Sequence, residues 1–415
     1  MTTMGSLGDL HPFLAIALGL QARGHRVTIA TSPYHGPKVV SEGIGFHAVR
    51  PNITPDDKEL MKLVMDAKKG GETVLKQIMF PSLRDSYQDL SEAVREADLL
   101  VTHPITYAGP IVAAKTGIPW ISTVLAPLSF FSEVDPPWMA PLPPLLRRAP
   151  WGPVVNKYVN RLGRRMVRSW SEPAVALRAE LGIPAGADPI FEGQHSPDLV
   201  LALFSPVFSP PQPDWPSQAQ TTGFVYYDQQ EKNKGLASEL TQFLDAGPPP
   251  IVFTLGSSAV MDARDFYFES AKAAVELGRR AILLVGSDAA NAAAASPSQG
   301  IIAADYAPYS ELFPRAAAVV HQGGAGTTAQ TLRAGLPMLV MPFAHDQHDN
   351  ARCVIRLGVG REIGRNQYRS GRPTAALQAL LGNPRYAATA ADVGRRIQLE
   401  DGVVAACDLI ERQLA

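Results

Sequence analysis

The 415-residue chain has little of what marks several large classes of protein. Its only cysteines, Cys353 and Cys407, are far apart and too few for a disulfide framework or a cysteine metal cluster. The 38 basic and 39 acidic residues give a formal net charge of -1, so no positive surplus points to nucleic acid or an anionic membrane. No apolar run has transmembrane length, and no signal peptide is evident. These absences predict a cytoplasmic protein with reduced thiols.

The composition is that of a globular enzyme-sized protein. Hydrophobic residues make up 46% and charged residues 19%, and the length suggests two domains, each able to bury a core. Strand-like and helix-like segments alternate, because apolar runs at 27–30, 98–102, 118–123, 251–255 and 281–285 are interleaved with helical patterns such as 12–23 and 264–277. This alternation predicts an α/β fold with parallel, doubly wound sheets.

Residues 321–350 are the most informative stretch for function. They begin HQGGAGTT, a glycine-rich turn between an expected strand and an expected helix. A turn without side-chain bulk at the start of a helix lets a phosphate approach free N–H groups and the positive end of the helix dipole. Such turns are common in α/β domains, but here an apolar strand at 338–341 leads to the polar pair Asp346 and Gln347 at the same sheet edge. The stretch therefore predicts a diphosphate site.

This order of residues resembles the donor-sugar signature of family-1 glycosyltransferases of the GT-B fold. Antibiotic, macrolide and sterol glycosyltransferases carry the form His-x-Gly-Gly-Ala-Gly-Thr-Thr with a later Asp-Gln. The resemblance covers nearly the whole chain, strongly at 250–365 and weakly at 128–215. It implies two Rossmann-like domains that face a central cleft: an acceptor domain (1–205), a proline-rich linker (206–217), a donor domain (218–395) and a C-terminal helix (396–415) that crosses back to the first domain.

The resemblance also implies roles for individual residues of the donor domain. The diphosphate would be bound by the ring of His321 and by backbone and hydroxyl donors at Gly323, Gly324, Ala325, Gly326, Thr327, Ser257 and Ser258. Asp346 and Gln347 would bind sugar hydroxyls, and Tyr306 and Ala307 the nucleobase. One position departs from the plant enzymes, which place Glu on the ribose where this chain has Ala329. Uridine and thymidine donors therefore both stay open.

The candidate base lies in the first loop, Gly8-Asp9-Leu10-His11-Pro12. Many relatives carry a catalytic His three residues before this proline, which is the place of Asp9, and antibiotic-type relatives carry Asp there. His11 is one step out of register but has a suitable ordinary pKa. An exposed Asp is a poor base unless burial or a partner tunes it, and it also caps helices well. We expect Asp9 to be the base, with His11 as the alternative.

His103 follows the expected strand at 98–102. In plant relatives this neighbourhood carries the Asp that pairs with the catalytic His. The resemblance therefore implies an exchanged pair, with Asp9 in the first loop and His103 opposite it, and either member placed to take the acceptor proton. The sequence equally allows a His103 that only ends a strand before Pro104.

Three other segments bear on the acceptor and on the chain's organisation. The proline-rich stretch 136–153 suggests a long functional loop, with Trp138, Met139 and Phe130 as candidates for the acceptor pocket. Residues 157–168 form a basic amphipathic helix, which we expect to be a solvated face rather than a membrane contact. Residues 1–4 directly precede the first loop, so the expected first strand is either very short or truncated.

The combined expectation is an inverting glycosyltransferase that moves a hexose or deoxyhexose from a UDP- or dTDP-sugar to a hydroxyl of a small lipophilic acceptor. Flavonoids, other polyphenols, macrolides and sterols are all open, and UDP-glucose and dTDP-rhamnose are the first donors to consider. No paired carboxylates are placed to hold Mg²⁺ on a diphosphate, so a metal-independent mechanism without a cofactor is expected. The alternatives are a nucleotide-sugar epimerase of the same fold and a non-catalytic auxiliary protein.

Overall fold

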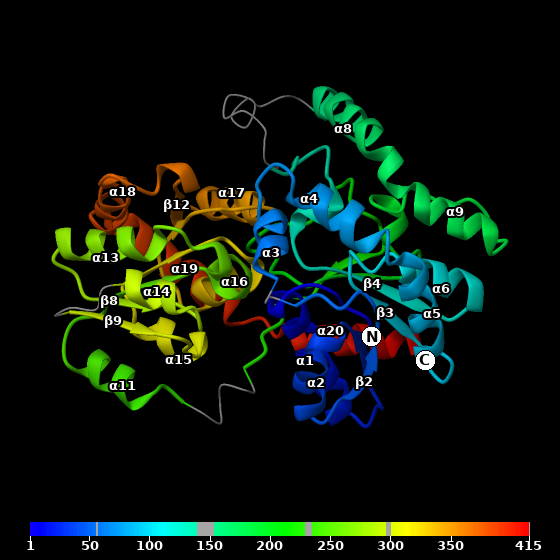
Figure 1. Cartoon of the computed structure of the whole chain (residues 1–415), viewed down its shortest axis with the longest axis horizontal. Coiled ribbons are helices and arrows are strands. Elements are labelled where there is room, and N and C mark those ends of the chain that lie inside the picture. Colours follow the sequence, from blue (N-terminus) through cyan, green and yellow to red (C-terminus); the bar gives the residue numbers. More distant parts are fainter. Residues whose placement is uncertain (55–56, 139–152, 229–234, 296–299, 415) are drawn as a thin grey trace. The chain divides into compact units, whose positions relative to one another are not determined.

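The computed structural model of the chain describes residues 1–54, 57–138, 153–228, 235–295 and 300–414 (Figure 1). These residues form two compact units. Unit 1 consists of Met1–Asp56, Lys68–Tyr226 and Asp401–Ala415, and unit 2 consists of Asp57–Ala67 and Tyr227–Glu400. Every strand pair in both units is parallel, so each unit has the expected α/β architecture.

Unit 1 holds six short strands in two hydrogen-bonded groups. The first group pairs β1 (Thr28–Thr31) with β2 (Gly45–Ala48). The second runs in the order β3 (Leu100–Thr102), β4 (Trp120–Val124), β5 (Val200–Ala202) and β6 (Ala219–Thr221). Strands β3, β4 and β5 are buried at every residue except the partly buried Trp120, as expected for parallel strands covered on both faces.

Residues 1–3 connect the two groups. Thr2 forms parallel bridges to Ala30 of β1 and to Thr102 of β3, and its N–H donates to the Val101 carbonyl at 2.7 Å. The very short first strand therefore occupies the position between β1 and β3. Counted along the chain with this first position as strand one, the sheet has the order 3-2-1-4-5-6-7, which contains the 3-2-1-4-5-6 order of doubly wound dinucleotide-binding folds.

The helices of unit 1 lie around this sheet and, for α8, at the margin of the unit. They are α1 (Leu7–Ala22), α2 (Gly36–Ser41), α4 (Gly70–Thr73), α5 (Leu83–Ala93), α6 (Ala108–Thr116), α8 (Pro153–Val167), α9 (Glu172–Glu180) and α20 (Gly402–Leu414). The last helix, α20, packs on α1, where Gly19 leaves room for Cys407. Arg23 at the end of α1 forms ion pairs with Asp408 and Glu411 of α20 at 2.6 and 2.7 Å.

Unit 2 holds a six-stranded sheet in the order β12-β11-β10-β7-β8-β9. In chain order the strands are β7 (Ile251–Thr254), β8 (Ala281–Leu284), β9 (Ile301–Ala304), β10 (Ala318–His321), β11 (Met338–Val340) and β12 (Gly360–Glu362). The same order, 3-2-1-4-5-6, results when they are numbered from β7. The strands after β7 are added on one side of it as far as β9, and from β10 onward they are added on the other side. Ligands of doubly wound sheets bind at such a switch point, here between β7 and β10.

The helices of unit 2 cover this sheet. They are α3 (Lys58–Val64), α11 (Ser238–Asp245), α12 (Gly256–Ala259), α13 (Phe266–Glu276), α14 (Ala289–Ala294), α15 (Tyr309–Leu312), α16 (Ala325–Arg333), α17 (Gln347–Leu357), α18 (Arg372–Leu381) and α19 (Pro384–Ile397). Helix α3 comes from the first third of the chain, yet Met65 at its end is buried in the unit 2 core.

The boundary between the two units differs from the predicted domain boundary. Residues 57–67 belong to unit 2, and the predicted linker 206–217 belongs to unit 1. Trp215, within that linker, stacks on Phe130 with ring centroids 4.2 Å apart, and the following strand β6 extends the unit 1 sheet beside β5. This proline-rich segment is therefore a packed part of unit 1, because the Trp215 side chain stacks on the buried Phe130.

Candidate active site

The glycine-rich turn of unit 2 lies at the switch point of its sheet. Strand β10 ends at His321, and the turn that follows leads into α16, whose N-cap is Gly324. The neighbouring strand β7 leads to a second turn at Gly256, and β11 leads to the loop that carries Asp346. Because parallel strands all point the same way, these three loops emerge at one edge of the sheet.

Gly323 gives the turn its shape. Its φ of 90° lies in the left-handed region that favours glycine. A Cβ there would lie 2.8 Å from Val340 Cγ1 and 3.0 Å from the Gln347 carbonyl oxygen, which leaves no space for a side chain. The turn thus aims the first N–H groups of α16 outward from the sheet edge, as an anion site requires.

Gln322 is a site residue that sequence reasoning missed. A Cβ on Gly256 would lie 2.4 Å from its Nε2, and one on Gly324 would lie 2.7 Å from it, so the amide sits between the two glycine turns. Its side chain is buried, and its Oε1 has no hydrogen-bond partner within the described part of the chain. Only its position inside the motif could have marked it in the sequence.

His321 differs from the expectation that its ring donates to a diphosphate. The residue is fully buried, its Nδ1 accepts from the Gly323 N–H at 3.0 Å, and its Nε2 lies 3.3 Å from Met338 Sδ. Burial lowers the pKa of His321 to about 3, so the ring is neutral at physiological pH. Both ring nitrogens already have partners inside the protein. In this structure the ring therefore holds the turn in place instead of facing a ligand.

The loop after β11 carries Asp346 and is stabilised by side-chain hydrogen bonds of Gln347 and Asn350. Gln347 Oε1 accepts the backbone N–H groups of Phe343 and Ala344 at 2.9 and 3.3 Å, so the amide oxygen is occupied within the loop. Asn350 Nδ2 donates to Asp346 Oδ2 at 2.7 Å and to the Gly323 carbonyl at 2.9 Å. Asn350, which the sequence reasoning also missed, therefore joins the Asp346 carboxylate to the glycine turn.

The remaining predicted donor residues lie on the same sheet edge. Ser257 and Ser258 belong to α12 directly after Gly256. Tyr306 follows β9 and is 61% exposed, whereas Ala307 is buried. Near the predicted ribose position, Ala329 is buried and Gln330 donates to Asp228 at 3.2 Å.

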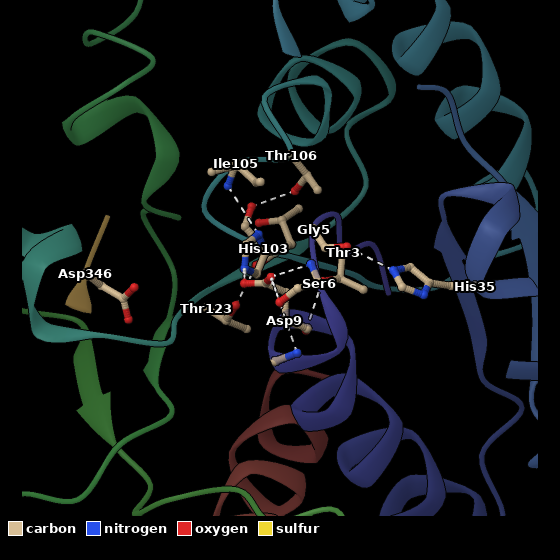
Figure 2. Close-up of polar contacts among 12 residues, drawn as sticks. Thr3, Gly5, Ser6, Asp9, His35, His103, Ile105, Thr106, Thr123 and Asp346 are labelled. Carbon is tan, nitrogen blue, oxygen red and sulfur yellow. Dashed lines mark hydrogen bonds and ion pairs between the residues drawn. The ribbon is translucent and has the colours of Figure 1, made fainter. Parts of the chain in front are cut away.

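Unit 1 brings Asp9 and His103 together, as Figure 2 shows. His103 Nε2 lies 3.3 Å from Asp9 Oδ1, and the other oxygen, Oδ2, accepts from the Ser6 N–H at 2.7 Å and from the Ser6 hydroxyl at 3.0 Å. The pairing follows from topology, because Asp9 follows the first strand position and His103 follows the adjacent β3. The Asp9 side chain is 33% exposed and that of His103 only 5%, so Asp9 is the member that solvent can reach.

Ser6 fixes the backbone around Asp9. It is the N-cap of α1, and Ser6 and Asp9 form a reciprocal capping box. The helix therefore begins at Leu7 rather than near Pro12. The spacing Ser6-x-x-Asp9 is a recognisable sequence signal for such a box, although it was not used in the prediction.

The environment of Asp9 keeps its carboxyl group ionised. Burial alone would raise the pKa of Asp9, but the hydrogen bond and the charge of His103, together with the bonds from Ser6, outweigh it and lower the pKa below the ordinary 3.8. His103 Nδ1 accepts from the Ile105 N–H at 3.4 Å, and the opposite ring nitrogen, Nε2, faces Asp9. The carboxylate is thus charged and oriented at neutral pH.

His11, the alternative base, lies in a different environment. Burial, followed by the charges of Lys38 and His35, lowers its pKa to about 3. His35 is itself buried, and its Nε2 lies 2.9 Å from the Gly5 carbonyl, so it supports the loop before Asp9. The structure therefore pairs Asp9, and not His11, with His103.

The three predicted acceptor residues differ in where the structure places them. Phe130 is buried and stacks on Trp215, with Phe204 at right angles to Trp215. Trp138 is partly buried, and Met139 lies outside the described residues. Phe130 therefore contributes to the aromatic core of unit 1.

Comparisons with known proteins agree over the whole chain. Residues 1–125 match the glycosyltransferase family 28 N-terminal domain, and residues 271–399 match the erythromycin biosynthesis protein CIII-like C-terminal domain. The chain is 31% identical to O-mycaminosyltylonolide 6-deoxyallosyltransferase of Streptomyces fradiae, over 99% of this chain and 96% of that protein. It is 30% identical to a sterol 3-beta-glucosyltransferase of Cryptococcus neoformans, over 99% of this chain but only 27% of that protein.

Solved structures share the fold. The glycosyltransferase VinC in complex with dTDP matches with a TM-score of 0.68 and 19% sequence identity, over 100% of this chain and 98% of that chain. At this level of identity, the likeness concerns the arrangement of strands and helices in the two units.

Proposed function

Because this chain belongs to the family-1 glycosyltransferases of the GT-B fold, we propose that it moves a hexose or deoxyhexose from a UDP- or dTDP-sugar to a hydroxyl of a small lipophilic acceptor. The transfer would be an inverting displacement that needs no metal ion. The relatives support this range, since one is named for a deoxyallosyl transfer to a macrolide and another for glucosyl transfer to a sterol.

The observation that carries the proposal is the Asp9–His103 pair. A binding protein of this fold has no need of a carboxylate that an imidazole orients at 3.3 Å and that a helix cap holds on its other side. Such a carboxylate is suited to accept a proton, because it is ionised and partly exposed, and its position is fixed before the substrate arrives.

The proposed step is a single displacement. The acceptor oxygen attacks the anomeric carbon, the bond from that carbon to the diphosphate oxygen breaks, and the diphosphate leaves with the electron pair. As the new C–O bond forms, the acceptor oxygen becomes positive and its proton more acidic, so a weakly basic carboxylate suffices to take it. Asp9 receives that proton, and His103 keeps the carboxylate in position.

Unit 2 offers the matching support for the leaving group. The N–H groups at the start of α16 and the positive end of its dipole stabilise the negative charge that develops on the diphosphate. The open backbone at Gly323 and Gly324 lets the phosphates reach these groups. Asp346, whose carboxylate Asn350 orients, would accept hydrogen bonds from sugar hydroxyls.

The test is a donor panel. The protein is incubated in EDTA with UDP-glucose or dTDP-rhamnose, each with and without a pool of phenols, macrolides and sterols, and the products are read by mass. We expect an acceptor mass raised by one hexose or deoxyhexose, with little donor consumed when acceptor is left out. A donor converted into its epimer without acceptor would establish the epimerase instead. Intact donor in every sample, despite nucleotide binding, would favour a non-catalytic role.

A further inference from the structure

Helix α8 presents three distinct rows of side chains along its length. Figure 1 shows it at the margin of unit 1, away from the strands of that unit. Residues three or four apart lie on one face of a helix. By that spacing, Asn156, Asn160 and Arg164 form one row, and the other two rows are apolar and basic.

The polar row faces the protein. Asn156 Nδ2 donates to the Glu133 carbonyl at 3.0 Å, and Asn160 Nδ2 donates to the Phe131 carbonyl at 3.4 Å. Arg164 forms an ion pair with Glu192, and its guanidinium lies 4.6 Å from the centre of the Phe191 ring. The helix is therefore anchored to unit 1 by polar side chains.

The apolar row faces outward as a consequence. Tyr158 is 67% exposed, Val159 53%, Leu162 63% and Met166 73%. An amphipathic helix of a globular protein normally turns its apolar side inward, so this arrangement is the reverse of the usual one. Four large apolar side chains along one exposed helix face indicate a surface that another body covers.

The basic row runs beside the apolar row. Lys157, Arg161, Arg165 and Arg168 follow at spacings of four, four and three residues, and all four are exposed. None of the 15 residues of α8 is acidic, although the chain as a whole carries a net charge of only -1. The positive charge is concentrated here, which overall composition did not reveal.

We propose that α8 is a membrane-surface helix that lies flat on anionic lipid, in place of the solvated face expected from the sequence. Tyr158, Leu162 and Met166 would enter the boundary between headgroups and acyl chains, and Lys157, Arg161 and Arg165 would meet the lipid phosphates. None of the described helices is long and apolar enough to cross a membrane. The contact is therefore peripheral, and its partner chemistry is an apolar layer bordered by negative charge.

Lipid fits this surface better than a second protein does. A bilayer interface supplies both features side by side along the full length of a helix, and each cation near an anionic surface adds to the attraction. A protein partner would have to offer an apolar groove flanked by a matching row of carboxylates. The proposal is independent of the transferase activity, because it concerns binding alone.

The test is vesicle flotation with the full chain. Vesicles of phosphatidylcholine alone are compared with vesicles enriched in phosphatidylglycerol, at low and high salt. We expect binding to the anionic vesicles to exceed binding to the neutral ones by about tenfold or more at low salt and to fall as salt rises. Amide hydrogen exchange should slow in residues 153–168 on the anionic vesicles, a readout that needs no variant.

Matched variants test the apolar row and the basic row of α8 separately. The double variant Leu162→Glu with Met166→Glu should abolish flotation, whereas Val275→Glu with Leu399→Glu, which adds the same charges at exposed apolar positions of unit 2, should leave it unchanged. Arg161→Gln with Arg165→Gln should remove the preference for anionic lipid, and Arg369→Gln with Arg385→Gln is its control. Circular dichroism checks that each variant is folded.

Three outcomes would overturn the proposal. They are wild-type protein that does not float with anionic vesicles, flotation that the α8 variants leave intact, and sedimentation showing a dimer that Leu162→Glu with Met166→Glu dissociates. The last would assign the face to a second copy of the chain.

Discussion

Unit 1 and unit 2 place their candidate sites at the same topological position but build them from different chemistry. In each sheet the direction of strand order reverses between the first and the fourth strand position, and the loops that follow those two strands carry the site. In unit 1 these loops meet through side chains, Asp9 and His103. In unit 2 they meet through the backbone, at Gly256, Gly323 and Gly324, with one buried amide between the turns.

The difference teaches what each half of a transferase must do. A proton acceptor needs a side chain whose charge and direction are set by neighbours, which Ser6 and His103 provide for Asp9. A diphosphate needs donors at a fixed spacing and room to approach them, which glycines at a helix N-terminus provide. Substitutions in unit 1 should therefore change turnover, and those in unit 2 should change donor affinity.

The largest expected effect is that of Asp9→Asn. The amide keeps the shape of the carboxylate but accepts no proton, so kcat should fall by about 10²- to 10⁴-fold while the KM for the donor stays unchanged. The matched control is Ser6→Ala, which removes the cap but keeps the carboxylate and should cost about 1 kcal/mol of stability with a much smaller loss of kcat. Full turnover by Asp9→Asn would remove Asp9 from the mechanism.

Gly323→Ala should give the next largest effect, in the other unit. An alanine at this position would have to keep a φ of 90°, and its methyl group would lie 2.8 Å from Val340 Cγ1, so the turn must shift. We expect the affinity for UDP or dTDP to fall by about tenfold or more, a loss of about 1.4 kcal/mol, as measured by calorimetry. Gly71→Ala is the control, since its methyl enters open space in α4 of unit 1, away from the donor turn. Equal stability and affinity in all three proteins would show that the turn needs no glycine at 323.

His103→Phe should act on the pH profile. Without the imidazole, burial raises the pKa of Asp9, so the acidic limb of kcat/KM should move to higher pH. Because the pKa of Asp9 in the folded protein is depressed, the pair stabilises the fold above the ordinary pKa and loses this effect as pH falls through the lowered value. His103→Gln keeps a donor and should restore much of the profile. An unshifted acidic limb in His103→Phe would contradict a positioning role for His103.

His11→Asn should have the smallest effect on turnover, within about threefold of wild type. Because the pKa of His11 is about 3 in the fold, below its ordinary 6.5, the unfolded chain binds the proton first, and the fold loses stability as pH falls between these values. Urea unfolding of His11→Asn should therefore vary less with pH over this range than that of wild type. A loss of kcat comparable to that of Asp9→Asn would make His11 the base.

Local patterns in the sequence predicted much of this arrangement. The glycine spacing before a helix placed the donor turn, since residues without a Cβ adopt positive φ readily and allow a close approach of the backbone. The proximity of Asp9 and His103 stayed open at that level, because it depends on which strands become neighbours. The short bridge at Thr2 decides it by holding β1 and β3 on either side of residues 1–3.

Other features depend on tertiary contacts that no periodicity encodes. The pattern of α8 shows an amphipathic helix, but only the contacts of Asn156 and Asn160 show that its apolar side faces outward. The ring of His321 was expected to face the ligand, and the buried neighbours Gly323 and Met338 hold it instead. Met338 lies on the neighbouring strand β11, and the carbonyl partners of Asn156 and Asn160 lie on the segment before α8, so these contacts depend on the tertiary structure.

The most direct test of the comparison is to measure nucleotide affinity and sugar transfer on the same preparations of Asp9→Asn and Gly323→Ala. The two-site account predicts opposite results for the two variants: Asp9→Asn should bind the donor nucleotide like wild type but transfer sugar at least about 100-fold more slowly. Gly323→Ala should bind weakly, yet transfer at a near-normal rate when donor is saturating. If Asp9→Asn loses nucleotide binding, or transfers sugar at the wild-type rate, the assignment of proton chemistry to unit 1 and donor binding to unit 2 is contradicted.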